Sequence, residues 1–325
     1  MIPVATRWLA VMLALAATPL PGPRDPEAAS RQGSLRSTLE DVPVTVVREH
    51  RYRMSAGIRP LLLFWINKDN VGGARVVWRA GEGGVREHEL VIGSDPARAP
   101  RRVNRWGFVR ERTDGRSADV VGLMTESDDQ SLDEAKTKVG EQAARGPVYK
   151  LIRSRVTPDS SRSETRAVRA TSEWSYRDVD KVMAALDGAA GTPRVREMPV
   201  PAGSRPGFLL VLVDLLHESV GVARQGGDKP RLLRGRVVPY VFNNTPYTLT
   251  LVSTTLLPRE RIDGRDYTRL LRHEFETLNH VARSRERFVL TCAVDGPLAE
   301  VPVQISYQPK WWFRAELVLD ERETF

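Results

Sequence analysis

The chain has 325 residues, of which 41% are hydrophobic and 28% are charged, and this composition excludes a globally disordered chain. The formal charge is +8, but the excess is arginine scattered among acidic residues, so no nucleic-acid partner is expected. A single cysteine, Cys292, excludes an internal disulfide, and its strand-like surroundings predict a small buried side chain.

The N-terminus has the three-part layout of a secretory signal peptide. Arg7 precedes an apolar run of ten residues, Ala14-Leu15-Ala16 forms an A-x-A cleavage site, and three prolines follow. We therefore expect a signal peptide over residues 1–21 and a periplasmic or secreted protein. An uncleaved membrane anchor stays open as the alternative. The run is shorter than the ~20 residues of a membrane span, so no transmembrane span is expected after cleavage.

A linker is predicted over residues 22–43, because this stretch is rich in Pro, Ser, Arg and acids. Residues 44–192 then predict a β-meander with two helices. Apolar β-formers alternate with short polar loops that contain glycine, and short loops make neighbouring strands antiparallel. The first predicted strands are 59–66, 74–79 and 85–92, and the loops between them are 67–73 and 81–84.

Two helices are predicted within this meander. The first spans about 131–143 and follows a Ser- and Asp-rich start. The second spans about 176–188, where Val179, Val182, Met183 and Leu186 make one apolar face and Gly188 ends the helix.

The region 206–325 predicts antiparallel strands after a leading buried helix, either as a separate sheet or as a continuation of the sheet of the first region. Its closing hairpin shows a period of two on both sides of a turn expected at 308–310. This pattern predicts Trp311 and Phe313 on the buried face and Trp312 on the more exposed one. The fold class is therefore mainly antiparallel β with a few helices, of the α+β kind, built as a half-barrel or curved sheet.

The last ~80 residues resemble uncharacterised exported bacterial β-rich domains of unknown function. The resemblance lies in the segments "DGRDYTRLLRHEFETLN", "ERFVLTC" and "GPLAEVPVQISYQPKWWFRAEL". It implies an antiparallel, half-barrel-like sheet and carries no catalytic residues. A broader similarity to periplasmic lipid-carrying half-barrels would imply an apolar concavity.

No catalytic or metal-binding motif stands out, so no catalytic residue, metal ligand or cofactor is expected. The chain has no G-x-S-x-G, no P-loop, no dinucleotide-binding glycines and no HExxH. "RHEFETLNH" places His273, Glu274, Glu276 and His280 close in sequence. On a strand His273 faces away from the other three, so a solvated edge is favoured over a metal site.

The wholly apolar run Leu61–Ile66 is the strongest candidate for a ligand site. A run apolar on both strand faces fits either an ordinary buried strand or a strand that lines an apolar cavity, with the polar segment after it at the mouth. The candidate ligand-binding residues are Leu61, Leu63, Phe64, Trp65, Asn67, Asp69 and Asn70.

The sequence favours a non-enzymatic, exported cell-envelope protein that carries or binds an apolar, lipid-like molecule. A structural or assembly factor that binds other envelope proteins is the alternative. A hydrolase with unrecognised carboxylates ranks third.

Overall fold

A computed structural model describes residues 39–59, 65–100, 104–125, 148–169, 174–187, 193–226, 234–310 and 313–320. The predicted signal peptide, most of the predicted linker and the helix expected at 131–143 lie outside these residues. They stay predictions.

Fifteen strands of the described residues form a single sheet. The strands are β1 Val44–Ile58, β2 Ile66–Gly81, β3 Arg86–Ser94, β4 Trp106–Thr113, β5 Ala118–Thr125, β6 Val148–Val156, β7 Ser160–Arg169, β8 Arg194–Pro199, β9 Arg205–Pro206, β10 Arg236–Phe242, β11 Thr245–Ile262, β12 Arg265–Asn279, β13 Arg285–Ala293, β14 Pro302–Lys310 and β15 Phe313–Leu319.

The strand order shows one meander whose two ends meet in the middle of the sheet. It runs β8-β7-β6-β5-β4-β3-β2-β1-β15-β14-β13-β12-β11-β10-β9, so the first strand pairs with the last. All pairs are antiparallel except the short β9–β10 pair. The strands of both predicted β regions therefore belong to one sheet, and the predicted fold class is confirmed.

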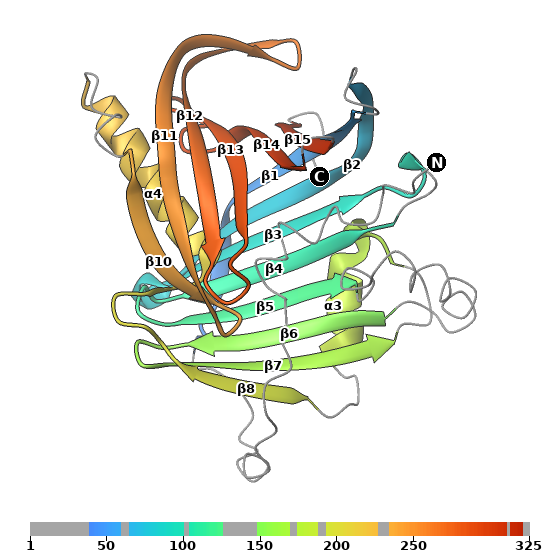
Figure 1. Ribbon diagram of the computed structural model, residues 1–325, viewed down its shortest axis with the longest axis vertical. Coiled ribbons are helices and arrows are strands. Elements are labelled where there is room, and N and C mark those ends of the chain that lie inside the picture. The colour runs from blue at the N-terminus through green and yellow to red at the C-terminus, as the bar shows by residue number, and fades with distance from the viewer. Residues whose placement is uncertain are drawn as a thin grey trace.

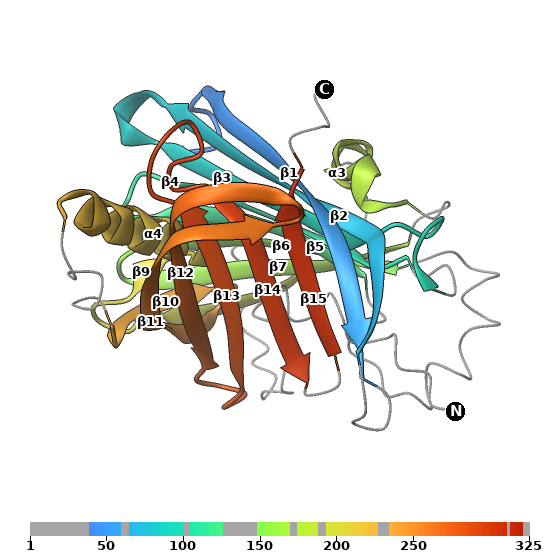
Figure 2. The same cartoon turned by 90° about the horizontal axis from the view of Figure 1, so that it is seen from above.

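The sheet curves until its two halves face each other. Figure 1 shows β3–β8 crossing β10–β13 at a steep angle, and Figure 2 shows β12–β15 lying in front of β5–β7. Helix α4, Phe208–Arg224, contacts β4, β9, β10 and β11. Its buried side chains, among them Leu210 and Val220, belong to the core between the halves or pack beside it.

A side chain links the two ends of the curved sheet. Asn243 and Asn244 form the β10–β11 turn, and both have positive φ. A tight hairpin turn requires this conformation, and asparagine adopts it more readily than most residues. Asn244 Nδ2 donates to the carbonyl of Arg196 on β8 at 2.7 Å, and Ser161 Oγ on β7 donates to Asn244 Oδ1. These hydrogen bonds bridge the two edges of the sheet, as closure does in a barrel. Among the described residues, however, no strand ladder joins the edges, so the sheet is open.

Aromatic rings fill the core next to α4. The Phe275 and Phe288 rings stack at 5.2 Å, the Tyr240 and Tyr247 rings stack at 5.3 Å, and Phe208 of α4 contacts both pairs. These rings bury large apolar areas, which ties the helix to β10–β13.

The period-two pattern of the closing hairpin is confirmed, but its turn lies elsewhere. Phe313 and Leu317 are buried, whereas Arg314 and Glu316 are partly exposed. Lys310 pairs with Phe313, so residues 311–312 connect the strands and the turn predicted at 308–310 is wrong. A register shift between Tyr307 and Lys310 places Pro309 in an irregular part of the strand, which suits a residue without an N–H. Trp311 and Trp312 lie outside the described side chains.

The loop predicted at 67–73 is also wrong, and most of the first predicted strand, 59–66, lies outside the described residues. Ile58 pairs with Ile66, so the chain reverses between them, and the segment predicted as a loop, 67–73, belongs to β2. A bulge opposite β1, with Asn70 at φ 58°, absorbs the irregular polar residues. Polarity and glycine content alone therefore misplaced the hairpin end. The loop at 81–84 is confirmed as the β2–β3 connection, with a 3-10 turn at Glu82–Gly84.

Two predicted helices are confirmed. A 3-10 turn at Tyr176–Asp178 leads into α3, Val179–Asp187, as expected for 176–188. Helix α4 is the buried helix predicted ahead of the C-terminal strands. Within the described part of the chain, neither helix is long and apolar enough to cross a membrane.

Candidate functional site

The predicted ligand residues cluster at the end of the sheet where the β1–β2 and β14–β15 hairpins adjoin. Ile58 of β1 pairs with Ile66 of β2 on one side and with Phe313 of β15 on the other. The connections at 59–65 and 311–312 therefore leave the sheet at this same end. We call it the β1–β2/β14–β15 end.

An apolar row on the core side of the sheet runs out to this end. Successive residues of a strand alternate between faces, so Met54, Ala56 and Ile58 share one face. Met54 is buried in the core and Ala56 packs against it, whereas Ile58 is 37% exposed and its partner Ile66 is 47% exposed. The row thus passes from the closed core to solvent without a polar interruption on β1.

The opposite face of the same end carries an aromatic–cation pair. The Arg314 guanidinium lies over the Trp65 ring, 4.8 Å from its centroid. Its NH2 donates to Asn67 Oδ1 at 3.1 Å. Gly57, between these side chains, permits the approach, since a Cβ there would lie 2.6 Å from Asn67 Oδ1.

The structure places the candidate residues in two groups. Leu61, Leu63 and Phe64 lie outside the described residues, in the connection between Ile58 and Ile66. Trp65 is half-buried beside Arg314, and Asn67, Asp69 and Asn70 lie on β2 rather than in a loop. Asn67 and Asp69 are exposed. The polar residues therefore lie close to the apolar connection along one hairpin.

A second site, which the sequence interpretation missed, lies at the N-terminus of α4. Glu111 of β4 is fully buried and accepts hydrogen bonds from the backbone N–H groups of Phe208 at 2.7 Å and Leu210 at 3.1 Å. Gly207, at φ 79°, has no side chain to cap the helix, so the carboxylate takes that role across the core.

Burial has the largest influence on the pKa of this carboxyl group. It raises the pKa of Glu111 to about 7, although the N–H groups of α4 act in the opposite direction. His88 pairs directly with Glu111 across β3 and β4, and burial lowers the pKa of His88 to about 4. Both oxygens of Glu111 are engaged by the helix, so the arrangement anchors α4 and leaves no free base.

Further charges fix the first turns of α4 from outside. Asp214 binds Arg86 of β3 at 3.0 Å and Arg205 of β9 at 2.6 Å.

Two features of the sequence could have indicated the site at Glu111 and α4. Glu111 lies on the same face of its strand as Gly107 and Val109, where an apolar residue is expected. The apolar helix α4 begins after Gly207, without a Ser, Thr, Asp or Asn cap.

His273 and Cys292 also meet in the core. Thr254 Oγ1 lies 3.1 Å from His273 Nδ1, and Cys292 Sγ lies 3.4 Å from His273 Nε2. Burial raises the pKa of Cys292 to about 12 and lowers that of His273 to about 4. The pair is a thiol beside a neutral imidazole, which is not an activated nucleophile.

Glu276 and His280 of the "RHEFETLNH" segment make other contacts. Glu276 binds Arg285 at 2.6 Å and Arg287 at 2.8 Å, and His280 Nε2 lies 2.7 Å from Thr248 Oγ1. Among the residues that the structure describes, no group of three or more His, Cys, Asp or Glu side chains could hold a metal ion.

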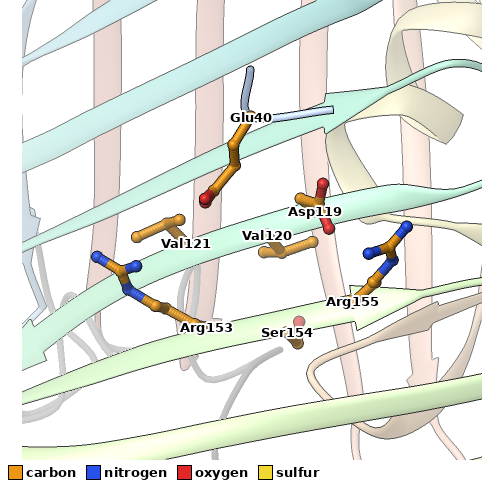
Figure 3. A pocket seen from close by; sticks show the side chains of 7 residues that line it. All are labelled: Glu40, Asp119, Val120, Val121, Arg153, Ser154 and Arg155. Atoms are coloured by element: carbon orange, nitrogen blue, oxygen red, sulfur yellow. The ribbon is translucent and has the colours of Figure 1, made fainter. Parts of the chain in front are cut away.

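A small polar hollow lies over β5 and β6. It encloses about 240 Å³ of space that is continuous with solvent, and its walls include Glu40, Asp119, Arg153 and Arg155. Figure 3 shows the two guanidinium groups reaching from β6 on either side of the hollow. Two carboxylates face two cations, so the lining favours neither an anion nor an apolar molecule.

No family model matches the chain, and no curated protein matches it. One solved structure to which it is similar is described as a beta-barrel-like protein of domain of unknown function DUF1849 from Brucella abortus. The identity is 6%, the match covers 86% of this chain and 98% of that chain, and the TM-score is 0.34. A likeness at this level carries no argument about what the protein does.

Proposed function

We propose that this is an exported cell-envelope protein that binds an apolar, lipid-like molecule at the β1–β2/β14–β15 end. The observation that carries the proposal is the exposed pair Ile58 and Ile66, which extends the buried row of Met54 and Ala56 into solvent. Isolated exposed apolar side chains are ordinary on protein surfaces, but a row that joins the core at a sheet end offers a continuous apolar contact.

The neighbouring sequence supports the same end. The connection after Ile58 contains Leu61, Leu62, Leu63 and Phe64, and the connection before Phe313 is Trp311-Trp312. Trp65, Asn67 and Arg314 supply polar and aromatic groups next to this apolar sequence. A mostly apolar contact with a few placed polar groups is the usual make-up of a small-molecule site.

The test is a lipid analysis of the purified protein. We expect mass spectrometry of an organic extract to find a lipid from wild-type protein and much less from Ile58→Ser/Ile66→Ser, whose melting temperature should fall only slightly. Val237→Ser is the matched control, because Val237 is 58% exposed on β10. A wild type that carries no lipid in several preparations would reject the proposal. A stable co-purifying envelope protein in its place would favour the assembly-factor alternative.

A further inference from the structure

Basic residues surround the apolar end of the sheet. Residues 57–70 contain Arg59, Lys68 and one acid, Asp69, and residues 308–314 contain Lys310 and Arg314 with no acid. The register brings these two stretches together, since Ile58 pairs with both Ile66 and Phe313. Among the described side chains, this end thus has three basic residues, Arg59, Lys68 and Arg314, and one acidic residue, Asp69.

Two arginines of β2 and β4 show a different arrangement. Arg79 binds Glu87 at 2.6 Å and Glu89 at 2.9 Å, and Arg112 binds Glu87 at 2.7 Å, so these arginines already have carboxylate partners. Arg314 is held by the Trp65 ring and an amide oxygen instead, and neither neutralises its charge. Among the described side chains, no carboxylate pairs with Arg314, so its positive charge is left for an outside partner.

The Trp65–Arg314 pair has the chemistry of a membrane interface. Tryptophan, with an apolar ring and one N–H donor, is enriched at headgroup depth, and guanidinium groups contact lipid phosphates there. The exposed Ile58 and Ile66 project from the opposite face of the same end and, one residue nearer the hairpin connections than Arg314, would lie deeper. Aliphatic, aromatic and cationic groups so arranged match a bilayer surface better than the neutral face of a protein partner.

We infer that the β1–β2/β14–β15 end docks on a bilayer that contains anionic lipids, with Arg314 at the headgroups and Ile58 and Ile66 against the acyl chains. The inference rests on the proposed function and names the partner of that site. A basic side chain close to an anionic surface contributes about fivefold to partitioning, so reversing the charge of Arg314 removes about 30-fold.

The experiment is flotation of the full chain with vesicles of phosphatidylcholine containing about 30% phosphatidylglycerol, and with vesicles of phosphatidylcholine alone. We expect binding to the first that weakens as salt rises, because screening shortens the reach of surface charges. Arg314→Glu should lower the partition coefficient by about 30-fold. The control is Arg194→Glu, which makes the same charge change at an exposed position on β8, the far edge of the sheet, and should stay within about twofold.

Ile58→Ser/Ile66→Ser provides a second arm that leaves the charge intact. It should lower binding to the anionic vesicles by tenfold or more, since burying each aliphatic side chain contributes to insertion. Equal binding by Arg314→Glu and Arg194→Glu, or no binding by wild type, would overturn the inference. A wild type that carries extracted lipid but ignores vesicles rejects docking and keeps the proposed function, and the reverse result rejects the carrier and keeps docking. Capture of another protein at this end, with no vesicle binding, would assign it to a protein partner.

Discussion

The two ends of the same core differ in how far their apolar side chains are shielded from solvent. At the α4 end, apolar side chains are buried, and a buried carboxylate on β4 caps the helix through Phe208 and Leu210. At the β1–β2/β14–β15 end, the apolar row reaches solvent at Ile58 and Ile66. The α4 end is therefore expected to contribute most to stability, whereas the other end is the one that we propose for a partner. Substitutions at the two ends should separate these roles.

The largest effect is expected from Gly207→Ala. A Cβ at this position would lie 2.5 Å from Glu111 Oε2, and φ of 79° disfavours a side chain. Strain and the displaced carboxylate together should lower the free energy of unfolding by about 4 kcal/mol. Denaturant unfolding measures it. The matched control is Gly221→Ala in the same helix, where no atom lies within 4 Å of the added Cβ and stability should rise slightly.

The next effect is a pH dependence carried by Glu111. Its pKa in the folded protein, about 7, lies above the ordinary value of 4.5, so its contribution to stability is present below pH 4.5 and is lost as pH rises through 7. The loss is about 3 kcal/mol, an order-of-magnitude figure. Buried His88 and His273, with pKa values lowered to about 4, act in the opposite direction, because they favour the unfolded state as pH falls from 6.5 to 4.

Because Glu111 and the two histidines change stability with pH in opposite directions, the effect of Glu111 is best measured as the difference in unfolding free energy between a Glu111 variant and wild type. We expect Glu111→Gln to gain about 3 kcal/mol relative to wild type between pH 4.5 and 7, as measured by urea unfolding at each pH. Glu82→Gln, at an exposed turn, is the control and should follow wild type throughout. Parallel curves for Glu111→Gln and wild type would show that the carboxyl group is not buried in solution.

A smaller effect is expected at the other end. Ile66→Ser should lower the free energy of unfolding by only about 1 kcal/mol, since the side chain is already 47% exposed. Leu317→Ser, on the same core face but 3% exposed, should cost several times more. Similar losses in thermal or denaturant unfolding would mean that the apolar end is closed in solution, and the contrast between the ends would fail.

The smallest effect concerns the pair of Trp65 and Arg314. A double-mutant cycle with Trp65→Ala and Arg314→Ala should give a coupling energy of about 0.5 kcal/mol, because a partly exposed cation–π contact is weak in water. Denaturant unfolding in the absence of lipid provides the measurement. A coupling energy above about 2 kcal/mol would assign the pair a structural role instead of a role in docking.

Local patterns predicted the parts of this fold that depend on neighbouring residues. Period-two alternation identified β15, and the i, i+3, i+4 spacing identified α3. They failed at the β1–β2 connection, because a continuous apolar run is compatible with a buried strand and equally with the end of a hairpin. Nothing in Leu61–Ile66 marks a turn, and only the pairing of Ile58 with Ile66 does so.

The missed site depends on contacts that no local pattern contains. Glu111 and Phe208 are far apart in the chain, and their contact exists only because α4 packs against both β4 and β10–β11. The link from Asn244 to Arg196 also joins distant residues. The sequence shows that Glu111 and the start of α4 are each unusual: Glu111 is a charged residue on the apolar face of a strand, and α4 lacks a capping side chain. It does not show that the two are in contact.

The pairing of β1 with β15 sets an order on folding. Tyr52 pairs with Leu319, so this ladder forms only after almost the whole described chain has been made, and it closes a very long loop. Until then β1 has one strand neighbour, and its other edge is open to pairing with another chain. A chain truncated before β15 would therefore be expected to aggregate through the open edge of β1, because the strand that covers this edge is the last one to be made.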